Sequence, residues 1–90
     1  MALSLKPDYA KAHNNLGIVY KKQGRLDEAL KEFLTALKLN PDDVITHYNM
    51  ALAYNLKGLK EKAIEELEIA LRLKPDHIQA RELLESLRRR

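Results

Sequence analysis

The sequence lacks several residue types, and each absence excludes a class of structure. There is no cysteine among the 90 residues, so disulfide bonds and thiol chemistry are excluded. Tryptophan is also absent, and glycine and proline occur only three times each, which excludes collagen-like and low-complexity chains. No apolar run approaches the roughly 18 residues that a membrane span needs, and the N-terminus has no signal-peptide pattern. We therefore expect a soluble protein, with the cytoplasm as its default location and no membrane partner.

The residues that are present indicate one small folded domain. Hydrophobic residues make up 46% of the chain and charged residues 32%, which is typical of a globular protein. The net charge of +3 favours acidic partners mildly and is well short of a nucleic-acid-binding signature.

A repeat organises most of the chain. Pro7, Pro41 and Pro75 are each followed by Asp, and they stand 34 residues apart. Residues 10–43 align with 44–77 without a gap, and eleven of the 34 positions are identical. The sequence therefore predicts four segments, which are the end of a truncated preceding repeat with its turn (1–9), a first unit (10–43), a second unit (44–77) and a last helix (78–90).

Each unit has the pattern of two helices. Apolar residues recur at spacings of three and four, as on one face of a helix. Gly24 and Gly58 interrupt this pattern and suit tight turns that need a positive φ. We expect no strands and five helices, which cover residues 9–22, 26–39, 43–56, 60–73 and 77–89.

The motif within the units is specific. The first unit contains His13-x2-Leu16-Gly17-x2-Tyr20, Ala29-x3-Phe33, Ala36 and Pro41, and the second contains His47-x2-Met50-Ala51-x2-Tyr54, Ala63-x3-Leu67, Ala70 and Pro75. This pattern resembles the tetratricopeptide repeat (TPR) over almost the whole chain, with His in place of the usual Trp. The resemblance implies an all-α fold, a right-handed superhelical stack of antiparallel helix pairs with two full TPR units and a C-terminal capping helix. Small residues would let helices approach closely, and Tyr20, Tyr54, Phe33 and Leu67 would fill the space between them.

The two ends of the stack are expected to differ. On the last helix, Ala80, Leu84 and Leu87 can pack back onto the second unit, while Glu85 and Arg88 form a polar outer face. The N-terminal face of the first helix would instead be apolar and exposed. Homo-oligomers that form through this face, or by helix swapping, are therefore a hypothesis that the sequence leaves open.

The resemblance also implies where a ligand would bind, because the first helix of each TPR pair lines the concave surface. By unit position, the expected peptide-binding residues are Lys11, Asn14, Asn15, Ile18, Lys22, Tyr48, Asn49, Leu52, Leu56 and Leu83. The same face also includes Lys21, Ile45, Asn55, Gln79, Glu82 and Ser86.

Two features of this face indicate its ligand. No Asp or Glu lies between Tyr9 and Gly24 or between Val44 and Gly58, so an extended, negatively charged peptide is favoured. Asn15 and Asn49 share one unit position, and their amides could clamp a peptide backbone. Simple solvation of short helices is the alternative explanation for both features.

One TPR binding mode does not fit. The chaperone-binding members hold a terminal carboxylate with Lys, Asn, Asn, Lys and Arg, and of the corresponding residues here only Asn49 matches. Without the cations the carboxylate loses its charge-assisted partners, so we do not expect binding of chaperone C-termini.

No catalytic or metal-binding arrangement is present in the sequence. His13 and His47 share one unit position and are expected in the core, with the carboxylates on other faces, so a zinc site lacks ligands. His77 is expected to be solvated in a turn. No nucleophile–base pair or phosphate loop is present, and the C-terminal arginines suit a helix C-terminus better than a nucleic-acid site. We expect no enzymatic activity, no cofactor and no small-molecule substrate.

The sequence therefore predicts a protein–protein interaction module that binds an extended peptide or partner segment, acidic peptides included, in the concave groove. The alternative is a structural or engineered repeat unit that self-associates and has no cognate ligand.

Overall fold

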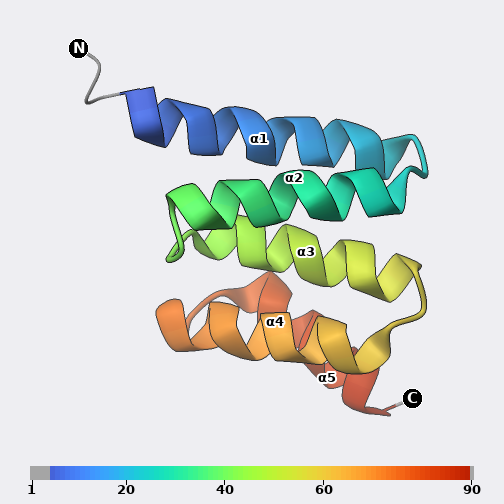
Figure 1. The fold of residues 1–90 in the computed structure, drawn as a ribbon. Helices are drawn as coiled ribbons and strands as arrows, with labels where there is room; N and C mark the ends of the chain where they lie inside the picture. Colours follow the sequence, from blue (N-terminus) through green and yellow to red (C-terminus); the bar gives the residue numbers. More distant parts are fainter. Residues whose placement is uncertain (1–4, 90) are drawn as a thin grey trace.

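The computed structural model describes residues 5–89, which form five helices and, within that range, no strand. The helices are α1 (Leu5–Lys22), α2 (Leu26–Leu39), α3 (Val44–Leu56), α4 (Lys60–Leu73) and α5 (Ile78–Arg89). Consecutive helices are antiparallel, and they form an extended stack with α1 at one end and α4 and α5 at the other (Figure 1). The predicted all-α stack of helix pairs is thus confirmed. None of the described helices is both long enough and apolar enough to cross a membrane.

The start of α1 differs from the prediction. The sequence suggests a turn around Pro7 and a helix from about residue 9, but α1 already begins at Leu5 and contains Pro7 near its N-terminus. Proline is tolerated there because the first amides of a helix have no partner within the helix. Residues 1–4, which hold most of the predicted end of an earlier helix, lie outside the described residues.

The turns within the helix pairs depend on glycine. Gly24 and Gly58 have φ values of 81° and 83°, which residues with a Cβ atom rarely adopt. They join α1 to α2 and α3 to α4 at equivalent positions of the two units. The prediction of positive φ at both glycines is confirmed.

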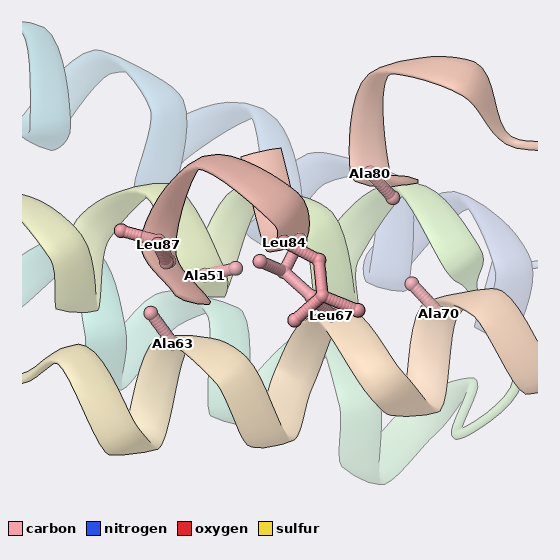
Figure 2. Packing of buried hydrophobic residues seen from close by; sticks show 7 residues of the cluster. All are labelled: Ala51, Ala63, Leu67, Ala70, Ala80, Leu84 and Leu87. Carbon is pink, nitrogen blue, oxygen red and sulfur yellow. The ribbon is translucent and has the colours of Figure 1, made fainter. Parts of the chain in front are cut away.

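Two clusters of buried side chains hold the stack together. One joins α3, α4 and α5 and contains the buried residues Ala51, Ala63, Leu67, Ala70, Ala80, Leu84 and Leu87 (Figure 2). The other joins α2 to α3 through Ala29, Phe33, Met50 and Ala53, with Ile18 and Tyr20 of α1 packed against it. Tyr54 packs against both clusters and so connects the two units. The small and bulky positions of the repeat motif therefore form the core as predicted.

The C-terminal helix closes one end of the stack. Ala80, Leu84 and Leu87 are buried against α4, whereas Glu85 and Arg88 are exposed, as predicted. The Arg88 guanidinium also donates to Glu68 of α4 over 2.7 Å.

His77 corrects one prediction, because it is not merely a solvated turn residue. Its Nδ1 accepts the Ala80 amide over 3.0 Å at the start of α5, and its ring lies 5.2 Å from the Tyr48 ring. The side chain thus serves as a cap for α5 and joins it to α3.

Candidate functional site

A groove of about 460 Å³ lies between α1 and the start of α3. It is lined by Ala10, Lys11, Asn14, Asn15, Ile18, Asn40, Asp43 and Ile45. Lys11, Asn15 and Ile45 are exposed in it, and Ile45 keeps 61% of its surface accessible. The groove therefore offers one cation, an amide and an apolar side chain to a ligand.

The predicted binding residues are only partly brought together. Lys11, Asn14, Asn15 and Ile18 all line the groove. The other six lie elsewhere on α1, α3 and α5, and they differ in exposure. Lys22 and Leu56 are exposed, Leu52 is half-buried, Asn49 is buried, and Tyr48 and Leu83 pack against the core cluster of α3, α4 and α5.

A network of buried polar side chains joins α1 to α3 beside the groove. Asp43 is the N-cap of α3 and accepts the Ile45 amide over 3.1 Å. The fully buried Thr46 hydroxyl lies 2.8 Å from Asp43 Oδ2 and 3.1 Å from Asn14 Oδ1, and its one hydrogen serves one acceptor at a time. Asn49 donates from Nδ2 to the same Asn14 oxygen over 3.1 Å. These bonds fix α1 against α3.

Asn15 and Asn49 are not equivalent in the structure, although they share a unit position. Asn49 is only 8% exposed because α1 lies against it, and its amide is bonded to Asn14. No described helix lies on the equivalent side of α1, so Asn15 is exposed. A peptide clamp by Asn15 stays a prediction, but Asn49 would first have to give up its bond to Asn14.

The charges around the groove are mixed. Lys11 has no ion-pair partner among the described residues, while the Asp43 carboxylate is engaged by the amide and hydroxyl groups of α3. Farther along α1, burial lowers the pKa of the Lys21 ammonium, and the neighbouring Lys22 charge adds to this effect. The part of α1 after Tyr9 and all of α3 lack acidic residues, but the turn between α2 and α3 contributes one acid, Asp43, to the groove.

Asn40 and Asp43 are lining residues that the sequence analysis did not include. Both belong to the turn between α2 and α3, and neither is among the concave-face positions that the resemblance implied. A signal was present for Asp43, since an Asp directly before a helical apolar pattern is a typical N-cap. The cap places this residue beside α1.

The two repeated histidines correct a second prediction. His13 Nδ1 lies 2.7 Å from Glu32 Oε1, and His47 Nδ1 lies 2.8 Å from Glu66 Oε1. The carboxylates therefore do not lie on other faces, since they contact the histidines across each helix pair. His47 Nε2 also lies 2.8 Å from the Pro41 carbonyl oxygen. Within the described residues, no group of three or more His, Cys, Asp or Glu could hold a metal ion.

Comparison with protein families agrees with this architecture. A family model described as "TPR repeat" matches residues 1–24 and 19–58, and a model described as "Tetratricopeptide repeat" matches residues 45–77. The chain belongs to the tetratricopeptide repeat family. No curated protein matches the sequence in a direct comparison.

Solved structures of TPR proteins superpose closely on this one. A chain of the APC/C hetero-tetramer Cut9–Hcn1 is 32% identical with a TM-score of 0.88, and the match covers 92% of the present chain and 16% of the other. YrrB, described as a TPR protein with an unusual peptide-binding site, is also 32% identical, with a TM-score of 0.80 and coverages of 82% and 38%. The first TPR of Spaghetti (RPAP3), solved with an HSP90 peptide, has a TM-score of 0.86 and coverages of 90% and 66%. At 23% identity, this last match supports the fold alone.

The present chain spans between 16% and 66% of the length of these three proteins. They show that the helix pairs of this TPR chain stack as in larger TPR proteins.

Proposed function

We propose that this TPR chain is a protein-interaction module without catalytic activity, and that it binds an extended segment of a partner protein in the groove between α1 and α3. The observation that supports the proposal is the groove itself, in which Lys11, Asn15 and Ile45 are exposed. YrrB, one of the superposed TPR structures, is described as having a peptide-binding site, which agrees with this function.

The chemistry of the groove favours a segment with at least one acidic and one apolar side chain. Lys11 is available for a carboxylate, whereas the Asp43 carboxylate already accepts the Ile45 amide and lies within hydrogen-bond distance of the Thr46 hydroxyl. Ile45 offers an apolar contact. The other predicted residues that are exposed, Lys22 and Leu56, would extend the contact toward the C-terminal ends of α1 and α3.

Selection from a library of random peptides tests this proposal. Because Lys11 and Ile45 are exposed, Lys11→Glu and Ile45→Asp should leave the helical content unchanged. We expect enriched peptides to be acidic, and Lys11→Glu to weaken their binding roughly tenfold, or about 1.4 kcal/mol. Leu34→Asp on α2 is the matched control, since Leu34 is 48% exposed and does not line the groove.

Two results would contradict the proposal. One is that no peptide is enriched over the Leu34→Asp background. The other is that enriched peptides bind Lys11→Glu and Ile45→Asp as well as they bind the unmodified chain. A peptide that ends in a chaperone C-terminus should not be enriched, because Gln79 and Leu83 stand at the clamp positions for Lys and Arg.

The alternative function, a structural unit that self-associates, is favoured by one observation. Leu16 and Val19 on the outer side of α1 are 40% and 47% exposed. Sedimentation over a wide concentration range tests it, since a self-associating unit should show oligomers that Leu16→Asp disperses.

A further inference from the structure

One helix face occurs three times in the chain, and it is covered only twice. It consists of three positions spaced four and three residues apart, which form one stripe of a helix. These positions are Ala12, Leu16 and Val19 on α1, Thr46, Met50 and Ala53 on α3, and Ala80, Leu84 and Leu87 on α5. On α3 and α5 all of them are at most 6% exposed. On α1 all three are exposed.

The covering element is the same in both covered cases. Met50 and Ala53 of the α3 stripe pack against α2, and the α5 stripe packs against α4; each of these covering helices has 14 residues. They contribute apolar side chains at shared unit positions, which are Leu30, Phe33 and Leu37 on α2 and Ile64, Leu67 and Leu71 on α4. An occupant of the α1 stripe should therefore be a helix with apolar residues at i, i+3 and i+7.

The ion pairs across these two covered interfaces have the same polarity. The Lys57 ammonium at the end of α3 pairs with Asp27 of α2, and Arg88 of α5 pairs with Glu68 of α4 over 2.7 Å. In both cases the cation lies on the stripe's helix or at its C-cap, and the acid lies on the covering helix. α1 carries Lys11, Lys21 and Lys22 and no acid between Tyr9 and Gly24.

From these observations we propose that the outer stripe of α1, formed by Ala12, Leu16 and Val19, is a docking surface for an acidic amphipathic helix of a partner protein. The partner helix takes the position on α1 that α2 takes on α3 and α4 takes on α5. This surface is separate from the groove that is lined by Asn14, Ile18 and Ile45.

A second copy of this chain fits the stripe less well than such a partner. Two α1 stripes that face each other would bring the lysines of both helices together, with no acid on either helix between Tyr9 and Gly24 to neutralise them. Like charges across an interface disfavour association, whereas an acidic helix repeats the charge direction of both internal interfaces.

The chain itself supplies the best-matched probe. Ala12, Leu16 and Val19 resemble Ala80, Leu84 and Leu87 in size more closely than they resemble Thr46, Met50 and Ala53. A synthetic peptide with the α4 sequence, residues 60–73, should therefore bind α1 more tightly than one with the α2 sequence, residues 26–39. Both peptides are capped at their termini to favour the helix.

Fluorescence anisotropy with the labelled α4 peptide and the full chain tests the proposal. We expect saturable binding that weakens at least tenfold in Leu16→Asp and is unchanged in Leu34→Asp and in the groove variant Ile45→Asp. Gln23→Lys should strengthen binding, because residue 23 is the unit equivalent of Lys57. Replacing the peptide's glutamates with glutamine should weaken binding.

Three outcomes would overturn the proposal. The first is that a scrambled α4 peptide binds as well as the native one, and the second is that Leu16→Asp has no effect on binding. The third is that the chain forms dimers by itself in sedimentation and that Leu16→Asp abolishes them, which would make a second copy the occupant. Circular dichroism of Leu16→Asp checks that the helices are retained, as expected for a substitution at an exposed residue.

Discussion

At the scale of single residues, the Phe33 ring leaves no room for a side chain at Gly17. A Cβ atom on Gly17 would lie 2.6 Å from Cε1 and 2.7 Å from Cδ1 of the Phe33 ring. The second unit has Ala51 and Leu67 at the same two positions, and both are fully buried. The unit with the larger Phe33 thus has glycine at the facing position, and the unit with the smaller Leu67 has alanine there. This indicates that the two positions are matched in size.

This match predicts strong coupling between the two positions. Gly17→Ala should cost about 1–3 kcal/mol of unfolding free energy, because the new methyl group would overlap the fully buried Phe33 ring. The double variant Gly17→Ala/Phe33→Leu, which copies the second unit, should be more stable than the sum of the single variants predicts. Urea unfolding of all four proteins measures this coupling. Strictly additive costs would show that the residues are not matched.

Tyr54 gives a prediction about pH. Burial raises the pKa of its hydroxyl above 10, and the nearby carboxylates of Glu66 and Glu65 add to the shift, while Lys57 opposes it. The folded state therefore disfavours the phenolate. The protonated Tyr54 hydroxyl therefore contributes its full share of stability below the pKa of the unfolded chain, which is near 10. This contribution is lost as the pH rises through the pKa of the folded state.

Thermal unfolding between pH 8 and pH 11 checks this prediction. The unmodified chain should lose stability above about pH 10. Tyr54→Phe cannot ionise, so its stability should fall less over the same range. Tyr9→Phe is the control, because Tyr9 is 54% exposed and should not change the profile. Parallel profiles for the unmodified chain and Tyr54→Phe would contradict the prediction.

At the scale of helices, the sequence predicts most of the structure because the periodic apolar residues and the two glycines act locally. α2 and α4 have the predicted bounds, and α3 and α5 begin one residue later than predicted. The predicted start of α1 was wrong because a proline is compatible both with a loop between helices and with the first turn of a helix. Sequence alone does not distinguish these two environments.

The candidate site could be predicted only in part, for a reason that lies in the packing of neighbouring helices. Unit position alone made Asn15 and Asn49 equivalent, but α1 covers one and no described helix covers the other. The same limit applies to Glu32 and Glu66, whose contacts with the histidines depend on how the helices of a pair are rotated. The turn residues Asn40 and Asp43 enter the groove only because α3 begins beside α1.

At the scale of the whole molecule, stability should follow the number of neighbours that each helix has. α3 packs against α2 and α4 and also touches α1, whereas the outer stripe of α1 is uncovered and α5 packs mainly against α4. In a stack of this kind each repeat contacts only the repeats next to it, so local opening starts at the ends.

Hydrogen exchange of the backbone amides tests this order of stability. We expect the slowest exchange in α3 and α4 and faster exchange in α1, although α1 is the longest helix with 18 residues. Burial on both sides, and not helix length, then sets the protection. If the α4 peptide docks on the outer stripe, it should slow exchange in α1 most and leave α4 unchanged. Protection of free α1 equal to that of α3 would contradict this order, because it would mean that the stack opens only as one unit.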